Sequence, residues 1–319
     1  MFQEETYNEK WYYSVELEPG RITKGFDFKN IASARKTLDA LDVGGHSVLD
    51  LSTMEGMFAT LLARRGAEVT ATDTIDNSAR VAMLKHAYDV AFQYIPHINL
   101  EDQAAFLFKH QLSSSFDPAR GLVSSQTTPF GYDVVFSSGV MYHVLSPLHY
   151  ILQLRRLVKL GGKVVIETAC AVSDEIELHH DYRHEGFVYG GSCSWFMSTG
   201  ALDLFLRACF LRPLGFTYVP SIVNSDLKVV RLGLVAEAVE DRPIAASLLE
   251  RIQHGEIVRS FDYKPLYESA QLTGSVAEPV SCDVGGLYPI GDKLSVVDFS
   301  DNPEFTYEPE YLRLYLGDQ

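Results

Sequence analysis

Residues 47–73 constrain the fold more than any other part of the chain. Residues 47–51 (SVLDL) form an apolar run that is typical of a buried strand, and residues 52–56 have the small and polar side chains of a turn. From Phe58 onward, apolar residues recur at helical spacing until Gly66, a residue type that commonly ends a helix. A second strand, residues 67–73, then ends in an acid. This order of strand, turn, helix and strand predicts an α/β sheet.

The turn after the first strand indicates which kind of ligand the chain binds. Proteins that bind dinucleotides place G-x-G-x-x-G at this point, so that the backbone can approach a pyrophosphate. This turn has a single glycine, Gly56, and an acid, Asp50, near its start. Negative charge favours a ligand with an amino group over a ligand with a phosphate. Asp73, at the tip of the second strand, is well placed to accept hydrogen bonds from both hydroxyls of a ribose.

The same turn resembles the first motif of the class I S-adenosylmethionine-dependent methyltransferases. That motif reads D-x-G-x-x-x-G, and residues 50–56 read DLSTMEG, with Ser52 in place of the first glycine. S-adenosylmethionine matches the charge pattern because it carries an amino acid, a ribose and an adenine but no phosphate. The alternative is an ordinary buried strand and turn. The resemblance implies that S-adenosylmethionine, as cofactor, contacts Asp50, Ser52, Glu55, Gly56, Phe58, Asp73 and Thr74.

Three further stretches resemble one subfamily, that of the tRNA wobble-uridine carboxymethyltransferase and related natural-product methyltransferases. They are the strand at residues 132–138 with GVMYHVLSPL after it, the segment GGKVVIET at residues 161–168, and an aromatic entrance segment, residues 11–25. The entrance segment has Tyr13 where histidine is common, and its alternative role is an edge strand packed on the core. The resemblance implies that the cofactor also contacts Trp11, Tyr13, Ser137, Ser138, Gly139 and Tyr142.

These motifs predict a doubly wound, mostly parallel, seven-stranded Rossmann-like α/β sheet with helices on both faces and an N-terminal cover segment. We divide the chain into the cover segment (1–46), an S-adenosylmethionine-binding methyltransferase domain (47–237) and a C-terminal extension (238–319). The extension has too few periodic apolar residues for a core of its own. We expect it to wrap the main domain, to form a homodimer contact or to cover the active site.

Some helices and strands are less clearly defined by the pattern. Helices are expected at residues 30–42, 76–94 and 244–253, and another is expected to begin after a capping Thr199. The third strand is not placed: it starts at Ile98, or residues 96–128 contain an insertion.

Three side chains are candidates for the acceptor side of the site. His143 is a candidate general base, because imidazole titrates near neutral pH, and its alternative role is packing within its loop. Tyr182 and Trp195 are expected near the acceptor, since aromatic side chains form a rigid cover. They belong to a polar loop, residues 169–198, that is rich in histidine and acids. Because this loop lacks an H-E-x-x-H pattern, we expect a solvated loop over the substrate mouth and no metal site.

The charge balance limits the partners of the protein. Formal net charge is −15 and no lysine- or arginine-rich run is present, whereas proteins that bind nucleic acid normally present a basic surface. We therefore expect a small-molecule substrate and no nucleic acid. The cysteines are scattered, the acidic N-terminus lacks the features of a signal peptide, and no apolar run approaches the roughly 20 residues that span a bilayer. A cytoplasmic protein without membrane contact is expected.

Three functions are consistent with these patterns. The first is methyl transfer from S-adenosylmethionine to an oxygen or nitrogen atom of a small polar metabolite in a biosynthetic pathway. The second, taken from the resemblance, is (carboxy)methylation of tRNA wobble uridine. The third is a non-catalytic S-adenosylmethionine-binding module, and Ser52 at the glycine position of the motif keeps this alternative open.

Overall fold

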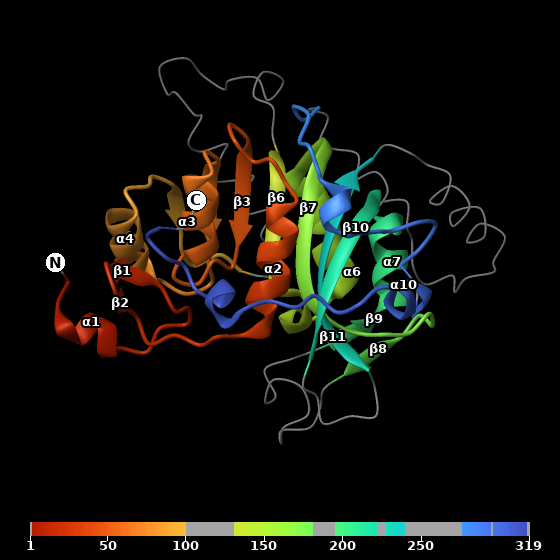
Figure 1. Cartoon of the computed structure of the whole chain (residues 1–319). Coiled ribbons are helices and arrows are strands. Elements are labelled where there is room, and N and C mark those ends of the chain that lie inside the picture. Colours follow the sequence, from red (N-terminus) through yellow and green to blue (C-terminus); the bar gives the residue numbers. More distant parts are fainter. Residues whose placement is uncertain are drawn as a thin grey trace, which may run out of the picture.

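The structure is a computed structural model that describes residues 2–99, 131–180, 195–221, 228–239, 276–294 and 296–317. Within these residues one mixed sheet forms the centre of the molecule (Figure 1). Its strands are β3 (Ser47–Leu51), β4 (Glu68–Thr72), β5 (Gln93–Ile95), β6 (Tyr132–Ser138), β7 (Val158–Ala171), β8 (Leu178–His180), β9 (Trp195–Ser198), β10 (Leu211–Pro220), β11 (Val229–Ala238) and β12 (Tyr288–Pro289).

The strand order confirms the predicted doubly wound sheet. The order is β12-β10-β11-β7-β6-β3-β4-β5, with β9 beside β7 and β8 beside β9. Strands β5, β4, β3, β6 and β7 are parallel, whereas β10 and β11 form an antiparallel pair next to β7. Strands β8, β9 and β12 are additional to the seven that were predicted.

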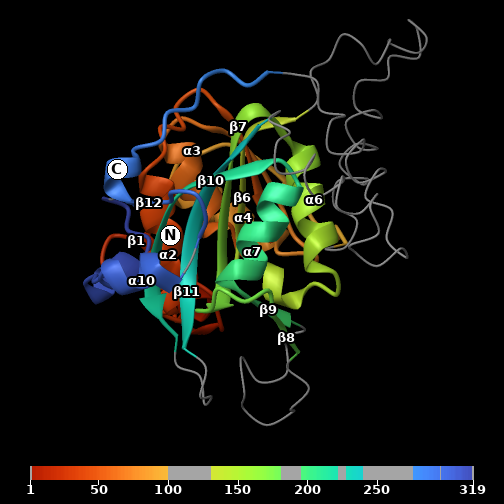
Figure 2. The same ribbon diagram turned by 90° about the vertical axis from the view of Figure 1, so that its right-hand side faces the viewer.

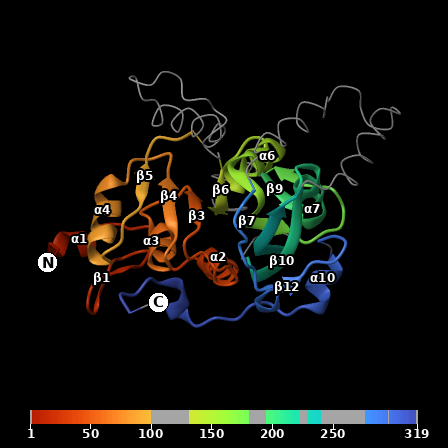
Figure 3. The ribbon, with the colours of Figure 1, turned by 90° about the horizontal axis from the view of Figure 1, so that it is seen from above.

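Helices cover both faces of the sheet, as the fold class predicts (Figures 2 and 3). One face carries α2 (Lys29–Asp39), α3 (Met57–Arg64) and α4 (Ser78–Ala87), whose apolar side chains share one core cluster. The other face carries α6 (Pro147–Leu157) and α7 (Thr199–Ala208), which belong to a second cluster. Helix α2 forms where expected because Ile31, Ala34 and Leu38 recur at helical spacing, and all three are fully buried.

The third strand is where the sequence prediction was wrong. Helix α4 ends at Ala87, and β5 follows within the stretch that was predicted to be helical. The helix stops before Asp89, which has φ of 50°, a left-handed conformation that does not continue a right-handed helix. Ile98, the predicted start of the third strand, instead donates its N–H to the carbonyl of Asp73 at 2.9 Å.

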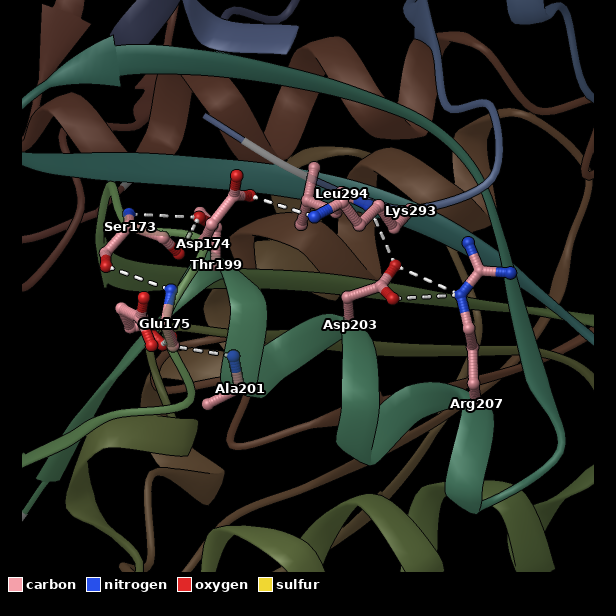
Figure 4. Close-up of polar contacts among 10 residues, drawn as sticks. Ser173, Asp174, Glu175, Thr199, Ala201, Asp203, Arg207, Lys293 and Leu294 are labelled. Atoms are coloured by element: carbon pink, nitrogen blue, oxygen red, sulfur yellow. Dashed lines mark hydrogen bonds and ion pairs between the residues drawn. The ribbon is translucent and has the colours of Figure 1, made fainter. Parts of the chain in front are cut away.

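The N-cap of helix α7 lies one residue earlier than predicted. The N-cap is Ser198, whose Oγ accepts the N–H of Ala201 at 3.0 Å. Thr199 instead donates its hydroxyl to the carbonyl of Ser173 at 2.9 Å, which attaches the helix start to the segment after β7. Figure 4 shows these contacts together with Asp203, which lies on the same helix.

The N-terminal part forms α1 (Glu4–Asn8) and a small hairpin of β1 (Glu16–Glu18) and β2 (Arg21–Ile22). The turn between these strands contains Pro19 and Gly20, and Gly20 has φ of 76°. Trp11 is fully buried, and its Nε1 donates to the carbonyl of Thr6 at 2.9 Å. The entrance segment therefore packs on the domain and leads into α2.

The described part of the C-terminal extension contacts the domain at several points. Strand β12 pairs with β10, and a short helix, α10 (Val296–Asp301), follows it. Asp203 of α7 accepts the N–H of Leu294 at 2.8 Å (Figure 4). Arg35 of α2 donates to the carbonyls of Tyr311 and Arg313 at 2.9 and 2.6 Å. The extension thus wraps the domain, while its roles as dimer contact or lid remain predictions.

Two expectations lie wholly or partly outside the described residues. The predicted helix at residues 244–253 and most of the proposed insertion at residues 96–128 fall there. Within the described ranges, every helix is too short or too polar to cross a bilayer.

Candidate functional site

A cavity of about 490 Å³ lies beyond the carboxyl ends of β3, β4 and β6. Ligands of open α/β sheets bind at this edge, and the volume is within the range of roughly 300–1,000 Å³ that small-molecule sites have. Its lining consists of Tyr12, Tyr13, Phe28, Asn30, Ser52, Met54, Asp73, Thr74, Ile75, Ser138, Gly139, Val140, Tyr142, His143 and Arg231.

The turn after β3 forms one wall of the cavity. Ser52 and Met54 have φ of 60° and 53°, left-handed conformations that glycine adopts more readily. Ser52 therefore keeps the backbone conformation that the glycine of the motif would favour, at a cost of roughly 1–2 kcal/mol. The Met54 N–H donates to Asp73 Oδ2 at 2.7 Å, and this bond holds the strained turn in place.

Asp73 has the geometry of a ribose acceptor. It is 2% exposed, and its Oδ1 accepts the N–H of Ile75 at 3.0 Å while its Oδ2 accepts that of Met54. Thr74 Oγ1 also donates to Oδ1, at 3.4 Å, whereas Met54 is the one donor to Oδ2 among the described residues, so Oδ2 has the most room for a ligand hydroxyl. Burial raises the pKa of the Asp73 carboxyl, and the backbone hydrogen bonds oppose that rise. Ile75, which is 54% exposed, offers an adjacent apolar surface for a flat base.

Asp50 lies behind the turn, outside the cavity lining. It is 1% exposed, and Thr53 Oγ1 donates to its Oδ2 at 2.5 Å. Burial raises the pKa of Asp50 to about 7, so its carboxyl is poised between the neutral and the charged form at neutral pH. A cationic group bound at the turn would favour the charged form. A ligand with a nucleoside at Asp73 and positive charge at the turn fits these residues, and S-adenosylmethionine has both features.

The entrance segment forms the roof of the cavity. The Tyr12 N–H donates to Glu55 Oε1 at 2.8 Å, and Arg80 Nη1 donates to the same oxygen at 2.9 Å. The Tyr13 ring packs edge-on against Tyr12 and Phe58, at centroid distances of 4.9 and 5.9 Å. Both donors bind Oε1, whereas Oε2 is buried without a partner among the described residues. Glu55 therefore connects the roof to the turn, and it is not part of the cavity lining.

A buried ion pair lies at the β7 and β11 side of the cavity, and its Arg231 belongs to the lining. Arg231 Nε and Nη2 donate to the two carboxylate oxygens of Glu167, each at 2.7 Å, and both side chains are buried. The Arg231 guanidinium lies over the Tyr142 ring, 4.9 Å from its centroid, and the Tyr142 ring is 4.4 Å from that of His143. Burial raises the pKa of Tyr142 well above its usual value, so the phenol stays protonated and can donate.

The cavity brings together about half of the residues predicted for the site. Those in its lining are Tyr13, Ser52, Asp73, Thr74, Ser138, Gly139, Tyr142 and His143. Those outside the lining are Trp11, Asp50, Glu55, Gly56, Phe58, Ser137 and Trp195. Tyr182 lies outside the described residues.

The displaced residues have other neighbours. Gly56 faces α4, where an added Cβ would lie 3.5 Å from Val81, and Phe58 packs against Phe136. Ser137 shares a hydrogen bond of 2.8 Å with Tyr150, on α6 and thus on the opposite face of the sheet. Side chains alternate along a strand, so Ser137 and Ser138 cannot both face the cavity. Trp195 donates its Nε1 to the carbonyl of Leu145 at 3.1 Å.

The sequence analysis missed several lining residues. They are Tyr12, Phe28, Asn30, Met54, Ile75, Val140 and Arg231. Arg231 had a recognisable signal, because a charged residue inside an apolar strand such as KVVRLGLV requires a partner. Asn30 had no such signal, because a polar residue at the start of an amphipathic helix is ordinary. Within the described residues, no group of three or more histidine, cysteine, aspartate or glutamate side chains could hold a metal ion.

Comparison with known proteins gives relatives for part of the chain. The tRNA U34 carboxymethyltransferase of Shewanella sp. strain ANA-3 is 38% identical over 149 residues, which are 46% of this chain and 41% of that protein. The protein of the same name from Shewanella sp. strain W3-18-1 is 30% identical over 156 residues, which are 49% of this chain and 43% of that one. The chain thus spans less than half the length of these curated relatives.

Solved structures with a similar arrangement are more distant. The 1,6-didemethyltoxoflavin-N1-methyltransferase of Burkholderia thailandensis, crystallised with 1,6-didemethyltoxoflavin and S-adenosylhomocysteine, is 16% identical with a TM-score of 0.44, over 66% of this chain and 79% of that one. The N-terminal domain of EvdMO1, with S-adenosylhomocysteine bound, is 16% identical with a TM-score of 0.45, over 72% and 91%.

The family assignment rests on a match to more than half of the chain. The Methyltransf_23 family, described as a methyltransferase domain, matches residues 24–209. This range begins in the entrance segment, contains the turn after β3 and Asp73, and ends after α7. The chain belongs to this methyltransferase-domain family and is an S-adenosylmethionine-dependent methyltransferase.

Proposed function

We propose that the protein transfers a methyl group from S-adenosylmethionine to an oxygen or nitrogen atom of a small polar metabolite in a biosynthetic pathway. The cavity carries this proposal. Its Asp73 end suits the nucleoside of the cofactor, and its far end, beside Gly139, is walled by aromatic rings and by the Arg231–Glu167 pair. A chamber of about 490 Å³ shared with a cofactor has room for a small acceptor.

In this proposal the residues of the chain bind and align the two reactants. The cofactor supplies an electrophilic methyl group, and alignment of the acceptor provides most of the catalysis. Asp73 holds the ribose, and the turn with Ser52 and Met54 lies against the methionine part. His143 lines the cavity and is our candidate to take the proton of the acceptor.

The roof has a second role, which is to keep water away from the methyl group. Tyr12, Tyr13 and Phe28 reach the cavity from the N-terminal part of the chain. The Tyr12 and Phe28 rings lie 5.1 Å apart, so the roof is a packed aromatic layer. Aromatic side chains suit this role because they cover a large area with few rotatable bonds.

The second candidate is methylation or carboxymethylation of tRNA. It is favoured by the 38% identity to a tRNA U34 carboxymethyltransferase over 149 residues. A formal net charge of −15 opposes it, because phosphate contacts with lysine and arginine dominate affinity for nucleic acids. The same acid balance is compatible with a small-molecule acceptor.

Label transfer distinguishes these functions. The protein is incubated with methyl-tritiated S-adenosylmethionine and either bulk tRNA or a panel of small phenols, amines and carboxylic acids. We expect label in a small molecule and none in tRNA, whereas label in tRNA alone would refute the proposal. Calorimetric binding of S-adenosylhomocysteine without transfer to any acceptor would indicate a non-catalytic binding module.

A variant of the candidate base provides the matched control. His143→Gln keeps a polar side chain of similar length but cannot act as a general base. We expect it to bind S-adenosylhomocysteine as the wild type does and to lose turnover by roughly 100-fold or more. Turnover at the wild-type rate would show that His143 only packs within its loop.

A further inference from the structure

Asn30 has a carboxamide with no hydrogen-bond partner among the described residues. It is 8% exposed and belongs to the cavity lining. Its backbone carbonyl accepts a hydrogen bond from Ser33 Oγ at 3.1 Å, but none of the described residues bonds its side chain. The carboxamide atoms of Asn30 are not among the fully buried unpartnered atoms, so they are open to the cavity, where a ligand can bond them.

The carboxamide nitrogen of Asn30 lies at a point where other polar atoms converge. The position that a Cβ on Gly139 would occupy is 3.5 Å from Asn30 Nδ2 and 3.3 Å from Tyr142 Oη. Arg231 Nη2 is 4.0 Å from the same position. A ligand atom cannot occupy that position itself, because it lies one bond from the Gly139 Cα, but all three groups belong to the cavity lining around Gly139 at the end of β6. All three can donate a hydrogen bond, so the cavity space beside Gly139 suits an oxygen atom.

This space is on the acceptor side of the cavity. Asp73 follows β4, and the β3 turn comes next, whereas Gly139 follows β6 and Arg231 is on β11. Helix α2 packs mainly on β7, β10 and β11. Asn30 therefore approaches the cavity from the side opposite the ribose acceptor.

The electrostatics of this end favour a neutral ligand. The positive charge of Arg231 is already balanced by Glu167, through two hydrogen bonds of 2.7 Å. The described residues of the lining carry no other lysine or arginine, so an anion would lack an uncompensated cation. The Tyr12, Phe28 and Tyr142 rings in the lining favour a planar molecule.

We infer that Asn30 is a specificity-determining residue whose carboxamide donates a hydrogen bond to an uncharged oxygen of a planar acceptor. This inference deepens the proposed function and rests on it. The start of α2 adds to the preference for oxygen, because its N-cap, Phe28, has no side-chain hydrogen bond to the helix and the N-terminal end of the dipole is positive.

Three probes of one size test this inference without knowledge of the natural acceptor. Benzamide, benzoate and benzylamine are titrated into the S-adenosylhomocysteine complex, and their dissociation constants are measured by ligand-observed NMR. We expect benzamide to bind the wild type most tightly of the three. Asn30→Ala should weaken benzamide by roughly 2- to 12-fold, as for the loss of one neutral hydrogen bond.

Asn30→Asp gives the sharper test, because it replaces the donor by a charged acceptor of the same size. It should weaken benzamide at least as much as Asn30→Ala does and should strengthen benzylamine. Asn8→Asp, the same change on α1 outside the lining, should alter neither probe. Equal benzamide binding in the wild type and Asn30→Ala, tighter binding of benzoate than of benzamide, or no binding of any probe would overturn the inference.

Cofactor affinity separates this inference from the proposed function. Both Asn30 variants should bind S-adenosylhomocysteine within about twofold of the wild type, since Asn30 lies away from Asp73. A large loss would make Asn30 a cofactor contact and overturn the inference. If the wild type methylates only tRNA while the probes respond as expected, the proposed function fails and the role of Asn30 within the cavity stands.

Discussion

Replacing Asp73 with alanine tests the nucleoside end of the site most directly. The variant removes the carboxylate that we propose to hold both ribose hydroxyls. Losing charge-assisted hydrogen bonds of this kind should weaken S-adenosylhomocysteine by about 1–3 kcal/mol, or roughly 5- to 150-fold in dissociation constant. Isothermal titration calorimetry measures this change.

The structure adds a cost in stability to this prediction. Asp73 accepts the N–H groups of Met54 and Ile75 at 2.7 and 3.0 Å, and the alanine variant leaves both without their acceptor. Each unsatisfied group costs about 1–3 kcal/mol if it stays buried. Because the Met54 bond also holds the strained turn, we expect the free energy of unfolding in urea to fall by at least about 1 kcal/mol.

A matched control separates binding from stability. Asp133 is also buried; it accepts the Ser47 N–H at 2.9 Å and the Lys159 ammonium at 2.8 Å, but near the amino end of β6. Asp133→Ala should lower stability by a similar amount and leave S-adenosylhomocysteine affinity unchanged. If folded Asp73→Ala protein bound S-adenosylhomocysteine with the wild-type constant, our account of the nucleoside end would be refuted.

Three further predictions follow from single contacts. Burial raises the pKa of Asp50 to about 7, above its unfolded value. Its contribution to the free energy of unfolding is therefore greatest below about pH 4 and falls by up to about 4 kcal/mol towards pH 7. Asp50→Asn should flatten that part of the stability–pH profile, and an unchanged slope would argue against the pKa shift. Arg231→Met leaves the buried Glu167 unpaired and should lower the free energy of unfolding by about 3–5 kcal/mol. The Arg231→Met/Glu167→Met double variant should recover most of this loss, and fully additive losses in the double variant would contradict the prediction. Glu55→Ala removes the acceptor of the Tyr12 N–H and should speed hydrogen exchange at that amide, while unaltered exchange would mean that the roof is held by packing alone.

Local sequence pattern was sufficient for most of the central strands and for the turn that defines the family. Apolar runs placed β3, β4, β6 and β11, because strands that are buried on both faces need continuous apolar residues. The pattern failed between residues 88 and 95, where the helix ends at a non-glycine residue, Asp89, in a left-handed conformation. A strand as short as β5 carries too few residues for its periodicity to be recognised.

The site residues divide in the same way. Asp73, Gly139 and Tyr142 were predictable because each directly follows, or nearly follows, a strand whose end is evident in the sequence. Glu55 was assigned to the cofactor because it lies in the motif, and its direction toward Tyr12 and Arg80 depends on where the entrance segment packs. A motif shows which residues share a turn, but it does not show which of their side chains will be hydrogen-bonded by other parts of the chain.

The sequence by itself therefore determined most of the sheet, the family and the end of the cavity that we propose for the cofactor, because these depend on residues that are near one another along the chain. The tertiary structure decided the acceptor end. Asn30 is the second residue of α2, Gly139 follows β6 and Arg231 lies on β11, and these residues meet only because α2 packs across β7, β10 and β11. The side chains that we propose to select an acceptor come from elements up to 201 positions apart, from Asn30 to Arg231, and no local pattern relates them.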